Sequence, residues 1–212
     1  MTETLTTLIA RIQVQLLDDG TLFSTATVSA AVRQALAAFN RSSPINGAEL
    51  IAVDSTRLQY ELTGGSFPDL VLDVHDVLLN DDDGDEDEPL EYDPIFEDNR
   101  IWIRLRDYEQ SGNLLIRFAQ LHTINGLDSE TESTMTTDQE QVLVDGACGY
   151  SIAMRLQKPI EQINLNDPSS IVASYEKAAI RYMTLFAVGL GRYTRRVAPV
   201  SERNDVQWTL DD

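Results

Sequence analysis

The chain has little of the chemistry that most often makes an enzyme or a metal site. Its 212 residues include one cysteine, Cys148, and two histidines, His75 and His122. A single cysteine forms no intrachain disulfide and cannot build a cysteine-rich zinc site. The histidines lack the HxH or HExxH spacing of metal sites, and neither a G-x-S-x-G motif nor a P-loop occurs. These absences favour structural roles for Cys148 and both histidines.

Long apolar runs are also missing. No apolar run approaches about 18 residues, and the opening MTETLTTLIA has neither a basic region nor a long apolar region. The hydrophobic content of 42% and the mean hydropathy of −0.21 are typical of a soluble globular protein. We therefore expect a cytosolic protein without a membrane segment.

Positive charge is scarce. Lys and Arg number 16 against 35 Asp and Glu, which gives a net charge of −19. This balance argues against a dedicated nucleic-acid binder. Residues 54–98 hold 16 acids and one base, so this stretch alone contributes −15. Its most acidic part, residues 80–89, is predicted to be a solvated loop because like charges repel one another. The acidic residues there are Asp81, Asp82, Asp83, Asp85, Glu86, Asp87 and Glu88.

The acidic residues raise the alternative of a calcium site, because carboxylate oxygens are hard ligands. An EF-hand aligned on Gly84 would place Leu79 at the first ligand position and Leu90 at the bidentate position, so the EF-hand hypothesis fails. An irregular, weak cation site stays open. With His75 it would make a calcium-binding module or a cation-dependent enzyme, which is the least favoured function.

Apolar residues recur with helical spacing near the N-terminus. The pattern over residues 5–16 predicts one amphipathic helix that ends before Asp19-Gly20. A second helix, capped by Ser24, is predicted up to the residues before Pro44. Because so short a loop joins them, we expect the two helices to lie side by side and antiparallel.

The helical period returns after Met135. Thr137 and Glu140 have the spacing of a capping box and predict the start of a third helix, which Pro159 ends or kinks. A fourth helix is predicted to begin at Pro168, with Asp167 as its N-cap. The apolar stripe expected to be buried on this helix comprises Ile171, Tyr175, Ala178, Ala179, Tyr182, Leu185, Phe186, Gly189 and Tyr193.

Between these helical regions the period is two. Alternating residues at 58–62, 71–79, 100–106 and 114–124 predict four or five antiparallel strands. The expected fold is therefore α+β: an antiparallel helical bundle of two N-terminal and two C-terminal helices, with an inserted small antiparallel β-sandwich or barrel. Residues 1–44 and 134–196 would form the bundle, residues 45–133 the insert, and residues 197–212 an extended C-terminal tail.

Two groups of residues near the C-terminus are candidates for a partner interface. Arg192, Arg195 and Arg196 end the fourth helix, where they either complement the helix dipole or dock on an acidic partner. Val206 and Trp208 are the apolar anchors of the tail. Aromatic side chains often dominate such interfaces, so we expect the tail or the basic helix end to dock on a partner.

Several segments resemble adaptor proteins of tailed bacteriophages, which lie beneath the portal in the head-to-tail connector. HTINGLD at 122–128 and EQVLVDGACGYSIA at 140–153 are similar to the second half of that family. GTLFST at 20–25 and AFNRSSP at 38–44 are similar to its first half. The resemblance covers most of residues 1–196 and is spread over many positions instead of one diagnostic motif.

The resemblance implies a structural virion protein of the neck, assembled in the host cytoplasm and without catalysis, cofactor or metal. Its partners would be the portal protein, a tail or nozzle protein, and further copies of itself in a ring that is commonly dodecameric. DNA would pass through the channel as cargo. An acidic channel wall would not grip phosphates, so we hypothesise that residues 81–88 line the channel instead of the outer rim. Another neck or tail-completion protein is the alternative.

Overall fold

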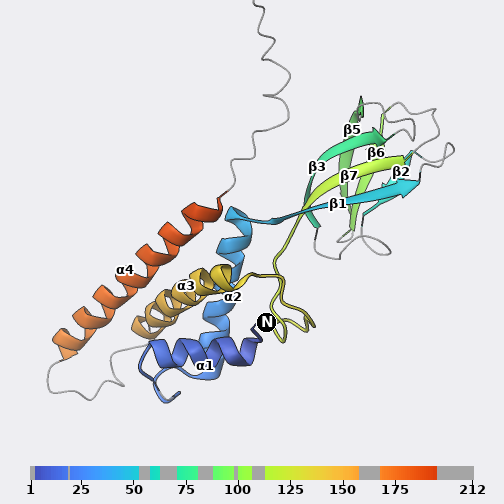
Figure 1. Cartoon of the computed structure of the whole chain (residues 1–212). Coiled ribbons are helices and arrows are strands. Elements are labelled where there is room, and N and C mark those ends of the chain that lie inside the picture. The colour runs from blue at the N-terminus through green and yellow to red at the C-terminus, as the bar shows by residue number, and fades with distance from the viewer. Residues whose placement is uncertain are drawn as a thin grey trace, which may run out of the picture. The chain divides into compact units, whose positions relative to one another are not determined.

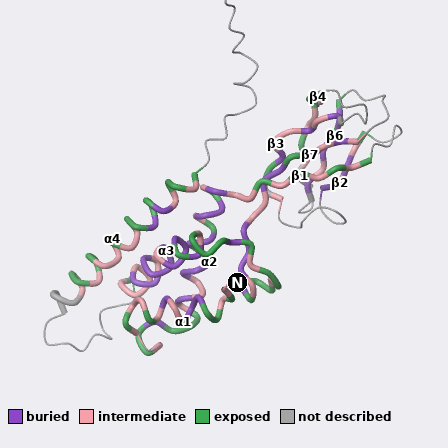
Figure 2. Tube along the Cα trace, viewed as in Figure 1, coloured by how far each residue is buried: buried purple, intermediate pink, exposed green. Residues whose placement is uncertain are grey.

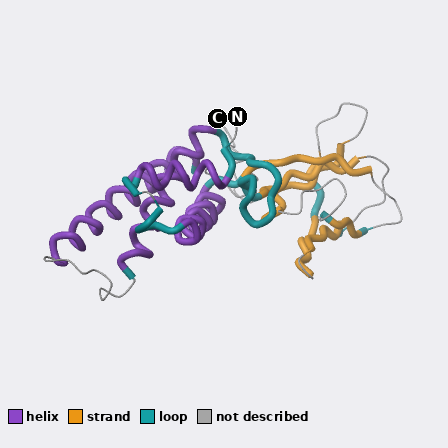
Figure 3. The backbone as a smooth tube through the Cα atoms, turned by 90° about the horizontal axis from the view of Figure 1, so that it is seen from below, coloured by secondary structure: helices purple, strands orange, loops and turns teal. Residues whose placement is uncertain are grey.

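The structure, a computed structural model, describes residues 3–18, 20–52, 58–62, 71–80, 88–97, 100–106, 113–157 and 168–194. These residues form four helices and two small antiparallel sheets, so the fold is α+β as predicted (Figure 1). The chain divides into a helical unit, Met1–Ser43 with His122–Arg195, and a β unit that contains Pro44–Leu121. Helices and strands are each confined to one unit, as Figure 3 shows in purple and orange.

The helical unit contains α1 (Leu5–Gln15), α2 (Thr25–Ser42), α3 (Thr137–Leu156) and α4 (Pro168–Tyr193). The Ser24 side chain accepts a hydrogen bond from the Thr27 N–H and caps α2, as predicted. Each helix contributes to one hydrophobic core, whose buried residues appear in purple in Figure 2. The largest fully buried side chains of this core are Leu8, Ile12, Phe23, Phe39, Ile124, Met135 and Leu143.

The start of α3 differs from the prediction by one residue. Thr136, not Thr137, is the N-cap, and Gln139, not Glu140, completes the capping box. Both threonines fit the sequence pattern, but Glu140 is 2% exposed and its Oε1 accepts a hydrogen bond from the Glu3 N–H at 2.8 Å. Glu140 therefore ties the start of the chain to α3 instead of capping its own helix.

The direction of α1 also differs from the prediction. Figure 1 shows α1 and α2 running in clearly different directions, so the expectation of an antiparallel pair is wrong. The reason lies in contacts beyond the connecting loop. α1 packs on α3 as well as α2, and the Gln15 side chain donates a hydrogen bond to Asp145 of α3. The side-by-side antiparallel pair of the unit is instead α3 and α4.

The β unit contains two sheets. The first has the order β1 (Ile45–Ala52), β7 (Asn113–Gln120), β3 (Val71–Asn80) and β4 (Glu88–Pro89). The second has the order β2 (Gln59–Glu61), β6 (Arg100–Leu105) and β5 (Tyr92–Glu97). All described pairs are antiparallel. Buried side chains of both sheets belong to one hydrophobic core, which includes Leu62, Ile103, Leu105, Leu114 and Ile116.

Three features of the strands are not evident from alternation in the sequence. The bulges of β3 bring Val74, Val77 and Leu79 into the core, although an unbroken period of two cannot bury all three. β1 begins at Ile45, before the alternating pattern is evident, and β5 contains Pro94. The sequence therefore predicts fewer strands than the seven within the described ranges.

Residues 122–133 belong to the helical unit, although the sequence pattern places them in the β insert. β7 ends at Gln120 and not at residue 124. Ile124 and Leu127, 1% and 2% exposed, lie in the helical core instead. Within the described ranges, no helix combines the length and the apolar character needed to cross a lipid bilayer.

Candidate interaction surface

Of the residues predicted to bind a partner, Arg192 is the one that lies in the described part of the chain. It is exposed in the last turn of α4, where its charge also complements the helix dipole. Arg195, Arg196, Val206 and Trp208 lie outside the described residues, and their role in an interface stays a prediction.

The acidic segment also lies largely outside the described residues. Asp81, Asp82, Asp83, Asp85, Glu86 and Asp87 are not described, and Glu88 is described through its backbone as the first residue of β4. Glu88 pairs with Leu79 of β3. The segment thus connects two paired strands, and its roles as a solvated loop, a cation site or a channel lining stay predictions.

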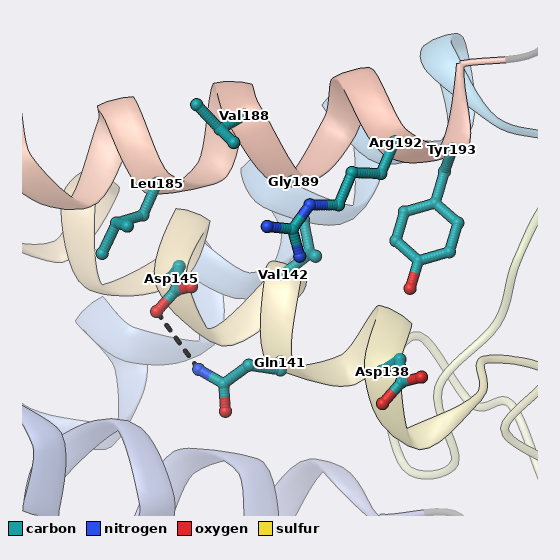
Figure 4. A pocket seen from close by; sticks show the side chains of 9 residues that line it. All are labelled: Asp138, Gln141, Val142, Asp145, Leu185, Val188, Gly189, Arg192 and Tyr193. Atoms are coloured by element: carbon teal, nitrogen blue, oxygen red, sulfur yellow. Dashed lines mark hydrogen bonds between the residues drawn. The ribbon is translucent and has the colours of Figure 1, made fainter.

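An open cavity of about 360 Å³ lies between α3 and α4 (Figure 4). Buried Val142 and Gly189 lie where the two helices meet. Asp138 and Asp145 border the cavity from α3, and Arg192 extends from α4 towards α3. The other lining residues are Gln141, Leu185, Val188 and Tyr193. The cavity therefore has an apolar floor and walls with charges of both signs at its border.

Glycines let α3 and α4 approach closely beside this cavity. A Cβ atom at position 146 would lie 2.7 Å from the Phe186 ring, and one at position 189 would lie 2.7 Å from the Val142 methyl groups. The sequence Gly189-Leu190-Gly191 lacks the third glycine of a dinucleotide-binding motif, so it predicts close helix packing for these two glycines. It is confirmed for Gly189, whereas a Cβ at Gly191 would meet nothing within 4 Å.

Three large apolar side chains in the described part of α4 are exposed, and two of them, Leu185 and Val188, line the cavity. Leu185 is predicted to be buried, but it is 43% exposed, so this prediction is wrong. Val188 is 56% exposed and Ile180 is 67% exposed. Exposed Arg181 and Arg192 flank these residues, and neither makes an ion pair with any described residue. We call Ile180, Leu185 and Val188 the α4 patch.

A second exposed apolar group lies where α1 ends. The Asp18 N–H donates to the Gln13 carbonyl and the Leu17 N–H donates to the Val14 carbonyl, which is the Schellman pattern of helix termination. In this motif Leu17 takes the left-handed position, with φ +54°. Glycine is the usual residue there, because a side chain strains the left-handed backbone. Leu17 is also 95% exposed, and Val14 is 72% exposed.

The loop after Leu17 is held by a carboxylate. Asp18 accepts hydrogen bonds from the Leu22 N–H at 3.0 Å and the Phe23 N–H at 2.8 Å. Burial by itself raises the pKa of Asp18, but these bonds, with others from Gly20 and Thr21, outweigh it and lower the pKa. Leu17 therefore lies next to a carboxylate that the Leu22 and Phe23 N–H groups hold in place.

Leu17→Gly is expected to stabilise the helical unit by about 0.5–1 kcal/mol. Relief of the left-handed strain contributes about 1–2 kcal/mol, and the greater backbone entropy of glycine offsets about half of it. Urea unfolding followed by far-ultraviolet circular dichroism measures the change. Val14→Gly is the control, and it should destabilise, because Val14 lies within α1 at ordinary helical geometry. Loss of stability in Leu17→Gly would contradict the assignment of strain.

Cys148 and His122 are both buried in the helical unit, whereas His75 is half-buried in β3. Burial chiefly, with a smaller contribution from the Asp145 carboxylate, raises the pKa of Cys148 to about 12. His122 is 5% exposed, its Nε2 donates to the Ser43 carbonyl at 3.1 Å, and its ring lies edge-on to Phe39. The structural roles predicted for Cys148 and His122 are consistent with this burial. No group of three or more His, Cys, Asp or Glu side chains in the described ranges could hold a metal ion.

His122 gives the helical unit a pH dependence. Burial lowers the pKa of His122 and outweighs the hydrogen bonds with Ser43 and Thr134 that raise it. The unfolded chain therefore binds a proton at a higher pH than the folded chain does. The contribution of neutral His122 to the free energy of unfolding should be fully present above about pH 6.5. It should decrease as the pH falls from there towards the folded-state pKa. Carboxylates also titrate in acid, so the free energy of unfolding is measured against pH for both the original chain and His122→Gln. The difference between the two curves should show the contribution of His122, because the variant lacks the imidazole.

Comparison with known proteins assigns no family to the chain. No protein-family model matches it, and no curated protein matches it either. What the chain does is therefore inferred from the geometry of its own surfaces and from the resemblance carried by its residues.

Proposed function

We propose that the chain is a structural head-to-tail adaptor of a tailed bacteriophage. Copies of it form a ring, commonly a dodecamer, between the portal and a tail or nozzle protein in the virion neck. DNA passes through the channel of the ring, and the subunit performs no catalysis.

The observation that carries the proposal is the pair of exposed apolar surfaces on the helical unit. The α4 patch lies beside two arginines that make no ion pair within the described ranges, and exposed Leu17 lies beside the Asp18 carboxylate. Surfaces of this kind suit a subunit that assembles with further copies, because the fully buried centre of an interface is apolar and complementary charges around it select the partner. The resemblance of residues 20–44 and 122–153 to phage adaptors gives the class of assembly.

Finer features of the architecture belong to the same proposal. The four helices act as the bundle that packs between neighbours, and the two sheets of the β unit face each other as a sandwich. The acidic segment at residues 81–88 lines the channel, where negative charge keeps DNA phosphates from binding. The basic end of α4 and the tail with Trp208 dock on the portal.

Purified virions of the phage that encodes the chain test the proposal. Mass spectrometry should detect the protein in the particle, and a reconstruction at side-chain resolution should place it as a ring directly below the portal. Deletion of residues 197–212 should weaken portal binding. A position at the tail tube would instead support the tail-completion alternative, and absence from the virion would overturn the proposal.

Calcium titration separates the proposal from the cation-binding alternative. We expect isothermal titration calorimetry of the whole chain to show no binding at millimolar calcium, because clustered carboxylates without an EF-hand frame bind weakly. A variant with Asp82, Asp83 and Asp85 changed to Asn is the control for nonspecific heat. Saturable binding that this variant loses would favour a calcium module.

A further inference from the structure

Leu17 is exposed, and the α3–α4 cavity is large enough to hold its side chain. Leu17 projects from the helical unit with 95% of its surface exposed. The cavity, at about 360 Å³, is larger than a leucine side chain, and its floor and walls include Val142, Leu185 and Val188. Burying a leucine in such a site contributes about 1.5–3 kcal/mol by the hydrophobic effect.

One pair of charges at the two surfaces is complementary, Asp18 and Arg192, while Asp138 and Asp145 also border the cavity. Asp18 follows Leu17, and its carboxylate is fixed by the Leu22 and Phe23 N–H groups. Arg192 borders the cavity and is exposed without an ion pair among the described residues. With Leu17 in the cavity, the adjacent carboxylate would meet a guanidinium that lacks a partner, and arginine is enriched at such contacts.

The backbone at Leu17 is a third and separate observation. A leucine at φ +54° strains the chain at a position where glycine would serve the Schellman motif better. Full exposure means that the side chain gains no packing within its own subunit in return. Burial of this leucine against another molecule would supply the hydrophobic stabilisation that offsets its backbone strain.

We propose that Leu17 of one copy inserts into the α3–α4 cavity of a second copy, with Asp18 against Arg192. The contact is heterologous, because the two surfaces differ. A pair of copies therefore keeps one free Leu17 and one free cavity, and further copies can add until a ring closes. This inference rests on the proposed function, since it names the contact between neighbours in the proposed ring.

Cysteine cross-linking of the full-length chain tests the contact. Leu17→Cys and Val188→Cys are made as separate variants and are then mixed under mild oxidation. Because burial keeps Cys148 a thiol, the introduced cysteines react selectively. The mixture should give a covalent dimer, and neither variant alone should do so. A double variant carrying both cysteines should give a ladder of larger species. Ala37→Cys, exposed on α2, replaces Leu17→Cys in the control mixture and should not cross-link to Val188→Cys.

Leu17→Gly should change the stability of the subunit and its self-association in opposite directions, which a role of Leu17 within its own subunit alone would not produce. It should stabilise the subunit, as argued above, and should weaken self-association in analytical ultracentrifugation by roughly tenfold or more, as expected for loss of an interface anchor. Unchanged association, or a dimer formed by Leu17→Cys alone, would overturn the inference. If the chain forms oligomers but residues 17 and 188 do not cross-link, the proposed contact is wrong. The proposal that copies form a ring would then still stand. Cross-linking by a protein that is absent from virions would overturn the proposed function alone.

Discussion

Gly146→Leu is expected to lower the free energy of unfolding of the helical unit by about 3 kcal/mol. A Cβ atom alone would lie 2.7 Å from Cδ2 and 2.8 Å from Cε2 of the Phe186 ring, and leucine adds three further carbons in the same direction. Phe186 is 2% exposed in the core, so its ring has little room to withdraw. Overpacking of this kind costs about 1–3 kcal/mol and sometimes more.

Gly191→Leu is the matched control, because it makes the same change on α4 where a Cβ meets nothing within 4 Å. Leucine favours helix over glycine by somewhat less than 1 kcal/mol, so this variant should gain a little stability. Far-ultraviolet circular dichroism in urea reports on the helices. Fluorescence of Trp102 in β6, measured after Trp208→Phe, reports separately on the β unit. Equal effects of Gly146→Leu and Gly191→Leu would show that α3 and α4 do not pack as described.

A compensating change tests the same contact more directly. Phe186→Ala by itself should destabilise by creating a cavity. Combined with Gly146→Leu, it removes the ring that blocks the new side chain, so the double variant should lose less stability than the two single losses added together. Simple additivity would mean that residues 146 and 186 are not in contact.

The positions of the helices were largely predictable because their signals are local. Ser24 as an N-cap and Pro168 at a first turn act within a few residues of the chain. The buried apolar residues of α2 recur at helical spacing in the sequence; they are Val28, Ala31, Val32, Ala35, Leu36 and Phe39. Where two local signals compete, tertiary contact decides. Thr136 caps α3, and Glu140 instead binds the Glu3 N–H from the other end of the chain.

Features set by distant contacts were not predictable. The direction of α1 depends on α3, which lies more than a hundred residues away in sequence. The bulges of β3 arise in its pairing with β7, and they shift which side chains face the core. Residues 122–124 continue an extended pattern, yet they pack against the helices because Asn40 and Ser43 bind His122.

The candidate surface was predicted only in part. Arg192 was identified from the charge at the end of its helix, whereas Leu17 was not identified. Periodicity assigns Leu16 to the buried stripe and gives no information about the residue after it. The available signal was a second leucine directly after the last residue of the stripe, at the end of the helix and before Asp18. Val188 and Ile180 could have been found as apolar residues off the buried stripe at helical spacing.

Asn40→Ala is expected to destabilise the helical unit by about 3 kcal/mol. Asn40 is 6% exposed on α2, and its side chain holds both main-chain groups of His122. Its Oδ1 accepts from the His122 N–H at 2.8 Å, and its Nδ2 donates to the His122 carbonyl at 3.3 Å. Alanine leaves both buried groups without a partner, and each unsatisfied group costs about 1–3 kcal/mol.

The effect of Asn40→Ala should extend to the residues that His122 positions. The His122 ring lies 5.4 Å from the Phe39 ring, and Phe39 lies 5.8 Å from Tyr193 of α4, so loosening at residue 122 reaches the packing of α2 against α4. Hydrogen exchange should show faster exchange at the amide of residue 122 and its neighbours. Asn46→Ala, an exposed asparagine in β1, is the control and should change stability by less than about 0.5 kcal/mol. Equal effects of the two substitutions would mean that Asn40 does not hold the end of α2 against the main chain of His122.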